Sequence, residues 1–215
     1  MRDPAQPLIT YYDGASRVEL SGSTTANWVA KTANLLVDGY GGPDRVGLLL
    51  PLHWHVVVVL LAGVATGASV VLAEEPGALA GCGVAFVHAP HAEAARDAGV
   101  DDVLALSCHP LGAPLPSVPA MVTDYAREVP SYADFFGGPT PAPARLELGG
   151  RTVALPEPAG LVAGDRVLTR LDPATPDGLA ALLHPLRAGA SLVLVTGEVD
   201  LDAVVSAERV THRLS

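Results

Sequence analysis

The chain carries two matching blocks, and this repetition constrains its fold more than any other feature. The first block runs from an Asp-Arg-Val at residues 44–46 to a Gly-Ala-Ser at residues 67–69. The second runs from an Asp-Arg-Val at residues 165–167 to a Gly-Ala-Ser at residues 189–191. An apolar stretch of nearly equal length lies between the two motifs in both blocks, which indicates an internal repeat. The sequence therefore predicts two related halves.

The second block contains the signals of a strand, a helix and another strand. Residues 165–171 alternate as a strand does, and Thr175 then provides an N-cap with Pro176 at the first helical position. Leucines follow at helical spacing until Gly189, which can adopt the left-handed conformation that ends a helix. The β-branched stretch 191–195 predicts the second strand.

The first block predicts the same order, with a strand at 46–50, a helix from His53 to about Thr66 and a strand at 69–72. Continuous apolar strands are typical of a parallel sheet covered on both faces. We therefore predict an α/β fold with two pseudo-symmetric βαβ-containing halves. The predicted domains are a first α/β subdomain at 1–120, a connecting segment with a hairpin at 121–160, and a partial second α/β subdomain at 161–215.

Other segments complete the α/β pattern. Strands are predicted at 84–87 and 102–106, with a short helix at 93–98 between them. Hairpins are predicted for 9–12 with 18–20 and for 146–148 with 152–155, a helix capped by Ser23 ends at Gly39, and 199–207 is predicted to be helical.

A membrane span is the alternative for the first block, because residues 46–73 contain no charged side chain and are long enough to cross a bilayer. Proline, histidine and glycine interrupt this stretch, however, and no basic cluster marks one side as cytoplasmic. The second block also carries Asp172, Asp177 and Arg187 within the same pattern. We therefore predict a buried helix and strands, and no membrane partner.

The charge balance excludes nucleic acid as a partner. The net charge is −10, with 23 acidic against 13 basic residues, and Lys31 is the only lysine. Such a chain repels nucleic acid and anionic lipid. Residues 1–7 show no secretory signal, and two cysteines, Cys82 and Cys108, do not make a disulfide framework. A reduced cytoplasmic location is the expectation.

No motif in the chain predicts a catalytic, cofactor-binding or metal site. His53 and His55 are two residues apart, so on a helix they would point to different sides. There is no Cys-x-x-Cys pair, no Gly-x-Ser-x-Gly elbow and no Gly-x-Gly-x-x-Gly fingerprint. The remaining zinc-type ligands do not have the spacing of a standard site: Cys82, His88, His91, Cys108 and His109.

The order of these elements resembles that of a known family. Residues 18–20, 42–51 and 62–68 resemble the N-terminal part of adenylate-forming enzymes, the acyl-CoA synthetase superfamily, and residues 163–168 and 186–190 resemble the middle of the same enzymes. The resemblance covers roughly residues 5–110 and 160–210. It implies a large N-terminal domain with two α/β subdomains related by pseudo-symmetry. In that family the domain serves the adenylation of a carboxylate.

The chain departs from the family at the motifs that bind the nucleotide and catalyse the reaction. The family's phosphate loop would lie between residues 121 and 158, but the stretch 137–145 contains three prolines and no lysine follows it. Ala174 and Thr175 stand where the family has an aromatic residue and a histidine. The chain ends at Ser215, before the family's adenine-binding and ribose-binding motifs and its C-terminal domain with the catalytic lysine, a role that Lys31 cannot take. The resemblance thus implies a truncated, degenerate relative.

Three functions remain open at this point. The favoured one is a non-catalytic binding or protein-interaction module without a cofactor, which forms a homo-oligomer, binds a protein partner or binds an acyl-type small molecule. The second is a residual or split adenylate-forming enzyme that a partner chain completes, and the third is a structural remnant without a ligand. Five residues are candidates for the lining of a cleft: His53, Trp54, His55, Thr175 and His184.

Overall fold

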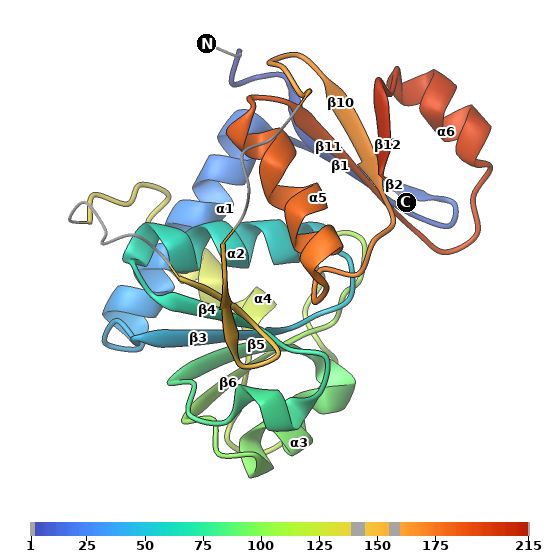
Figure 1. The fold of residues 1–215 in the computed structure, drawn as a ribbon. Helices are drawn as coiled ribbons and strands as arrows, with labels where there is room; N and C mark the ends of the chain where they lie inside the picture. Colours follow the sequence, from blue (N-terminus) through green and yellow to red (C-terminus); the bar gives the residue numbers. More distant parts are fainter. Residues whose placement is uncertain (1–2, 139–144, 155–159, 215) are drawn as a thin grey trace.

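The computed structural model describes residues 3–138, 145–154 and 160–214, which form two sheets with helices between and outside them (Figure 1). The seven-stranded sheet has the order β7-β6-β5-β3-β4-β8-β9, and the five-stranded sheet has the order β12-β10-β11-β1-β2. The strands of the first are β3 (Arg45–Leu49), β4 (Ser69–Leu72), β5 (Val84–His88), β6 (Asp102–Leu106), β7 (Val122–Asp124), β8 (Leu146–Leu148) and β9 (Arg151–Val153). Those of the second are β1 (Pro7–Asp13), β2 (Ser16–Ser21), β10 (Arg166–Thr169), β11 (Ser191–Thr196) and β12 (His212–Leu214).

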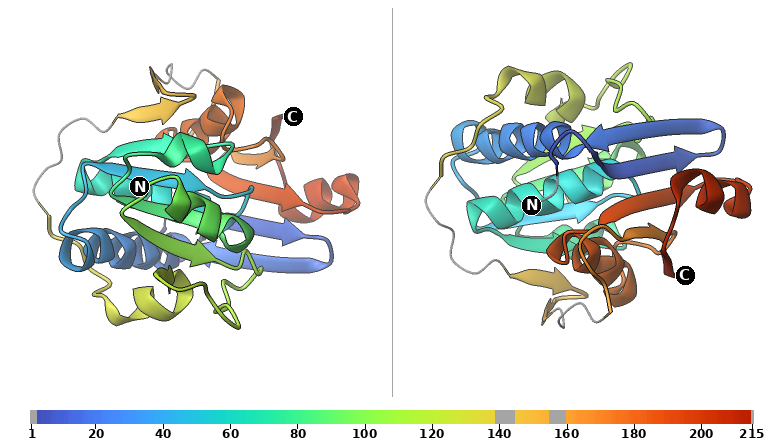
Figure 2. Two further views of the ribbon diagram at one scale, coloured as in Figure 1. Left: turned by 90° about the horizontal axis from the view of Figure 1, so that it is seen from below. Right: turned by 90° about the horizontal axis from the view of Figure 1, so that it is seen from above.

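The helices are arranged in layers around these sheets (Figures 1 and 2). They are α1 (Gly22–Asn34), α2 (Trp54–Thr66), α3 (Ala92–Asp97), α4 (Tyr125–Glu128), α5 (Pro176–Arg187) and α6 (Leu201–Glu208). Helices α1, α2 and α5 share one buried core with the facing sides of both sheets. Helix α3 covers the outer face of the seven-stranded sheet, and α6 covers the outer face of the five-stranded sheet. The predicted α/β fold class is confirmed.

Both sequence blocks fold as predicted, as a strand, a helix and a parallel strand. β3, α2 and β4 form the first unit, and β10, α5 and β11 form the second. The same backbone hydrogen bond closes each unit: Ser69 donates to the carbonyl of Asp44 at 2.8 Å, and Ser191 donates to that of Asp165 at 2.9 Å. The charge-free stretch is thus two strands and a helix. None of the helices within the described residues is long and apolar enough to span a bilayer.

The ends of the helices follow their cap residues. The Thr175 hydroxyl accepts a hydrogen bond from the N–H three residues on at 3.1 Å, and Gly67 and Gly189 have φ of 82° and 76°, as predicted for helix stops. The prediction for α1 was wrong by two residues. Ser21 caps this helix rather than Ser23, because the Ser21 backbone is still extended at φ −66° and ψ 168°.

Strand pairing crosses the predicted domain boundaries. The hairpin β1–β2 is confirmed, but β1 pairs in parallel with β11, so residues 7–21 share a sheet with residues 166–214. The hairpin β8–β9 is also confirmed, and β8 extends the first sheet beside β4. The short elements β7, α4 and β12 were not predicted. The division at residues 120 and 160 stays a prediction about domains, whereas the sheets join segments from both sides of it.

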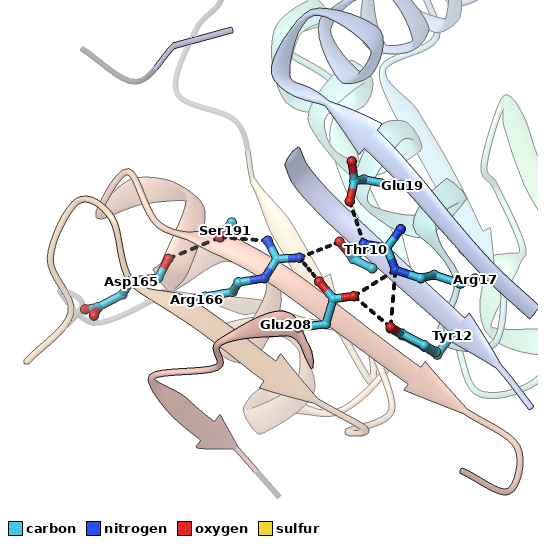
Figure 3. A network of polar contacts seen from close by, with 8 residues as sticks. All are labelled: Thr10, Tyr12, Arg17, Glu19, Asp165, Arg166, Ser191 and Glu208. Atoms are coloured by element: carbon cyan, nitrogen blue, oxygen red, sulfur yellow. Dashed lines mark hydrogen bonds and ion pairs between the residues drawn. The ribbon is translucent and has the colours of Figure 1, made fainter. Parts of the chain in front are cut away.

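A buried carboxylate fixes the N-terminal hairpin to β10 and α6 (Figure 3). Glu208, at the end of α6, is only 7% exposed. It accepts hydrogen bonds from the Tyr12 hydroxyl and from Arg17 Nε, both at 2.7 Å, and pairs with Arg166. Arg166 also donates to the Thr10 hydroxyl at 2.7 Å. The network therefore links β1 and β2 to β10 and α6 across the face of the sheet.

Candidate functional site

The topology of the seven-stranded sheet marks one place for a ligand. From β3 the chain crosses to β4 on one side, and it then returns to β5 on the other side of β3. Segments that leave β3 and β5 at their carboxyl ends therefore diverge. In open α/β sheets, such a switch point leaves a crevice outside the strands, where ligands bind.

A cavity of about 300 Å³ lies at this switch point. Residues at or just after the carboxyl ends of β3, β4 and β5 form one wall, and the loop after β10 forms the other. An adjoining pocket of about 370 Å³ shares Ala73, Glu74 and Ala174 with it. We call this cavity the switch-point cleft, and its lining residues are Leu49, Leu50, Pro51, Ala73, Glu74, His88, His91, Asp172 and Ala174.

The polar lining of the cleft is acidic. Glu74 and Asp172 contribute carboxylates, and the rings of His88 and His91 lie 6.3 Å apart between centroids. Burial, assisted by the nearby His91, lowers the pKa of His88 and keeps it neutral at neutral pH. Among the described residues of this lining there is no lysine or arginine. The cleft therefore favours neutral or cationic groups over phosphates.

A tight turn presents Ala174 to the cleft. Asp172 holds this turn, since its side chain accepts a hydrogen bond from the Ala174 N–H at 2.9 Å and its carbonyl accepts one from the Thr175 hydroxyl at 2.8 Å. The turn requires Gly178, because a Cβ there would lie 1.8 Å from the Asp172 carbonyl oxygen. Thr175 is thus occupied with capping α5, and the small residue Ala174 lines the cavity.

The predicted cleft residues His53, Trp54 and His55 lie in the core instead, with exposures of 0%, 2% and 2%. His53 precedes α2 with extended backbone, φ −159° and ψ 156°, and its Nδ1 accepts a hydrogen bond from the His55 N–H at 3.1 Å. The two imidazole rings stack with centroids 4.6 Å apart. The expectation that they point to different sides was wrong, because only His55 belongs to the helix.

This cluster is closed off from solvent by aromatic rings and by the loop after β6. Tyr11 and Tyr125 pack edge-on against the two imidazoles, and Trp54 Nε1 donates to the carbonyl of Pro110 at 2.9 Å. Burial lowers the pKa of His53 to about 4, and it also lowers the pKa of His55 well below its usual value. Both ring nitrogens of His55 lack a hydrogen-bond partner within the described structure. These imidazoles are therefore neutral core residues at neutral pH.

His184 lies in a third environment. It lines a groove of about 370 Å³ between α5 and β12, together with Asp177, Arg213 and Leu214. The five candidate residues are therefore divided among the aromatic core, the α5 cap and this groove. Sequence reasoning missed His88, His91 and Glu74 as cleft residues, although each stands at or just after a predicted strand. Only the strand order, which local patterns do not give, brings them together.

The remaining candidate ligands are dispersed. Cys82 is fully buried beneath β3, whereas Cys108 and His109 lie in the loop beside His53. Within the described ranges, no three His, Cys, Asp or Glu side chains are grouped so that they could hold a metal ion. Most of the predicted degenerate phosphate loop, residues 139–144, lies outside the described residues, as does 155–159.

Comparison with known proteins agrees with this architecture. No family model matches the chain. A curated relative from Mycobacterium tuberculosis (strain ATCC 25618 / H37Rv), described as "TIGR03089 family protein", is 40% identical over 225 residues, covering 99% of this chain and 93% of the relative.

Solved structures share the fold at lower identity. An acyl-CoA synthetase from Brucella canis matches with a TM-score of 0.78 and 18% identity, over 98% of this chain and 44% of its own. MatB from Rhodopseudomonas palustris matches with a TM-score of 0.72 and 16% identity, over 99% of this chain and 46% of its own. The anthranilate CoA ligase AuaEII, solved in complex with anthranoyl-AMP, matches with a TM-score of 0.71 and 17% identity, over 98% of this chain and 45% of its own. The chain thus spans less than half the length of these solved proteins.

Proposed function

Since the chain belongs to the TIGR03089 family and has the fold of the N-terminal region of acyl-CoA synthetases, we propose that it is a non-catalytic binding or protein-interaction module. Its role is to hold a ligand or a partner rather than to activate a carboxylate. We further propose that it acts in the cytoplasm, in keeping with two free cysteines of which Cys82 is fully buried.

The observation that carries this proposal is the lining of the switch-point cleft. Adenylation requires positive groups around the nucleotide phosphates. The charged side chains that line this cleft are instead the carboxylates Glu74 and Asp172, and the turn from the second repeat contributes the methyl group of Ala174. An acyl-type ligand suits the cleft when it is uncharged, as an amide or thioester, and not as an adenylate.

Two other functions compete with this one. A split enzyme completed by a partner chain is favoured by one observation, namely that the chain covers 44% of the Brucella canis synthetase. A structural remnant without a ligand would need a closed cleft, and the cavity of about 300 Å³ speaks against it. The binding module accounts for both the open cavity and its acidic lining.

We expect uncharged acyl amides and thioesters to raise the melting temperature of the protein. At a ligand concentration of about 100 times Kd, the added stability is about 2.7 kcal/mol, or roughly 5–10 °C for a chain of this size. Replacing Ala174 by tryptophan fills the cleft and should abolish the shift. Ala94→Trp, at an exposed position of α3, is the matched control and should leave the shift unchanged.

The same thermal titration can contradict the proposal. If Mg-ATP or acyl adenylates stabilise the protein and Ala174→Trp removes this effect, the result would favour an adenylate-forming enzyme instead. If no acyl compound stabilises the protein, the cleft is not an acyl site and the module would act through protein partners alone.

A further inference from the structure

We propose that His53 is an acid-sensitive switch of the switch-point cleft: a proton added to its ring breaks the cap of α2 and opens the wall that the segment before α2 forms. This inference rests on the proposed function and deepens it, because it assigns a form of regulation to the same site. The position of His53 in the chain connects it to the cleft. Leu50 and Pro51 follow β3 and line the cavity, and His53 ends the same segment at the start of α2.

Two hydrogen bonds fix where the His53 ring carries its proton. Its Nδ1 accepts the backbone N–H of His55 at 3.1 Å, so this nitrogen carries no proton. Its Nε2 lies 3.2 Å from the carbonyl oxygen of His109, which can only accept, so Nε2 is the donor. A further proton can therefore be added only at Nδ1, the atom that caps α2. Protonation of His53 and capping of the helix exclude each other.

The surroundings of the ring do not compensate a positive charge. His53 is fully buried and stacks on His55, whose two ring nitrogens lack a partner within the described structure. From α1 the neighbour is the uncharged ring of Trp28. The titratable groups around the two imidazoles are Tyr11 of β1, Tyr125 of α4, His88 of β5, and Cys108 and His109 of the loop after β6. Burial raises the pKa of both tyrosines and of the thiol, so none of them is negative at neutral pH. An imidazolium at this place would thus be unpaired.

The loop after β6 covers the imidazole pair. Gly112 of this loop packs directly against the first turn of α2, because a Cβ there would lie 2.9 Å from the Trp54 ring and 3.0 Å from the His55 ring. The Trp54 Nε1 donates to the carbonyl of Pro110 at 2.9 Å, and the Nε2 contact described above is the second attachment of the loop. The loop therefore depends on the same histidine that caps the helix.

The geometry of the loop confines the movement to a few residues. The Ser107 hydroxyl donates to the carbonyl of Ala113 at 2.7 Å and holds the two ends of the loop together. Between them, Cys108 and Gly112 have φ of 54° and 65°, and for the cysteine this left-handed conformation is uncommon. Leu111, near the tip, is 71% exposed. The part that can lift from the rings is thus the stretch 108–112.

Acid acts on the cleft through this arrangement. A proton on Nδ1 removes the acceptor of the His55 N–H and turns two donors toward each other. The charged ring is stabilised only where water reaches it. Water reaches it when the loop lifts and the segment before α2 moves, and this movement displaces Leu50 and Pro51 from the cleft wall. A ligand that holds the closed wall and a proton that favours the open wall therefore oppose each other.

Hydrogen exchange read by mass spectrometry tests the switch on the unaltered chain at pH 7 and pH 5, with labelling times corrected for the intrinsic rate. Opening of the segments 50–57 and 107–113 should become about twentyfold more favourable at pH 5, because the pKa of His53 is about 4 when buried and 6.5 when exposed. Both segments should exchange before the core strand β11, which distinguishes local opening from global unfolding. The start of α5 is the internal control, since its cap, the Thr175 hydroxyl, does not titrate.

Two variants act on the switch in opposite directions. His53→Asn keeps an acceptor for the His55 N–H but does not titrate, so it should remove the pH effect in both segments. Gly112→Ala places a methyl group against Trp54 and His55 and should expose both segments already at pH 7. Gly99→Ala is its matched control, because Gly99 also has a positive φ, of 87°, but open space around the added methyl group. Circular dichroism confirms that the variants are folded.

An uncharged acyl amide tests the coupling to the cleft. Hexanamide at about 100 times its Kd should suppress the opening of both segments about a hundredfold, because it binds only the closed wall. If hexanamide raises the melting temperature but leaves the opening unchanged, the switch does not act on the cleft and the proposal is overturned.

The proposal is also overturned if local opening is the same at pH 7 and pH 5, or if His53→Asn keeps the pH effect. These failures leave the proposed function intact, because the thermal titration with acyl compounds does not depend on them. If instead no acyl compound raises the melting temperature, the proposed acyl site fails, while hydrogen exchange still decides whether the switch exists.

Discussion

Replacing Glu208 by leucine is expected to lower the free energy of unfolding by about 3–5 kcal/mol. Glu208 is the acceptor for Tyr12, Arg17 and Arg166 (Figure 3). The Arg166 side chain is only 12% exposed, so without the carboxylate its charge stays buried and unpaired. Arg17 is 42% exposed and can be hydrated instead. The cost therefore arises mainly from Arg166.

Urea denaturation measures this effect, with Glu19→Ala as the matched control. Glu19 contacts the same network through Arg17 at 2.6 Å, but its side chain is 39% exposed. Such exposed pairs contribute about 0.2–1 kcal/mol. If Glu208→Leu costs no more than the control, the buried network does not hold the N-terminal hairpin to β10 and α6.

Lowering the pH from about 7 to about 4 is expected to remove about 3 kcal/mol of stability through His53 alone. The pKa of His53 is about 4 in the folded protein, because burial disfavours the imidazolium, against 6.5 in the unfolded chain. Between these values the unfolded chain binds a proton that the folded chain does not. Stability is thus complete above pH 6.5 and falls as the pH approaches 4. His55, whose pKa is also lowered by burial, adds to the loss.

The variant His53→Asn isolates the contribution of His53 to the pH dependence of stability. Asparagine is a good N-cap and can accept the hydrogen bond of the His55 N–H in place of Nδ1. It does not titrate, so the difference in stability between the two proteins should diminish from pH 7 to pH 5 by about 2 kcal/mol. A difference that stays constant with pH would show that His53 is not buried as a neutral imidazole.

Local signals account for what the sequence predicts well. Thr175, Pro176 and Gly189 bound α5, and the matching Asp-Arg-Val and Gly-Ala-Ser motifs place a parallel βαβ unit in each half. These elements depend on neighbouring residues and are therefore visible in a single sequence. The hairpin β1–β2 is of the same kind, since its strands are only a short turn apart.

Long-range pairing accounts for what the sequence does not predict. Nothing near residues 7–13 indicates that β1 pairs with β11 near the other end of the chain. The short β7 and α4 are held by the buried Asp124, which accepts hydrogen bonds from the N–H groups of Leu115 and Ala126, both at 2.9 Å. Each element is too short for a periodic pattern of apolar residues to be recognised in the sequence.

The switch-point cleft was missed for the same reason. The strands that end at Leu49 and His88 were predicted, and Pro51 was noted as a residue that interrupts a membrane span and as part of the family resemblance, but not as a cleft residue. Their convergence with Asp172 depends on strand order and on how the two sheets pack against each other. His53 and His55 seemed more informative in the sequence, but their positions beside Tyr11 and Tyr125 make them core residues.

The central claim is that this acyl-CoA synthetase fold does not activate carboxylates, and carboxylate-dependent exchange of pyrophosphate into ATP tests it most directly. The purified chain is incubated with Mg-ATP, labelled pyrophosphate and a panel of short, long and aromatic carboxylates, with Ala174→Trp in parallel. We predict exchange no faster than in the protein-free blank for every carboxylate. Exchange above the blank that Ala174→Trp removes would contradict the account, because it would assign adenylation to this cleft.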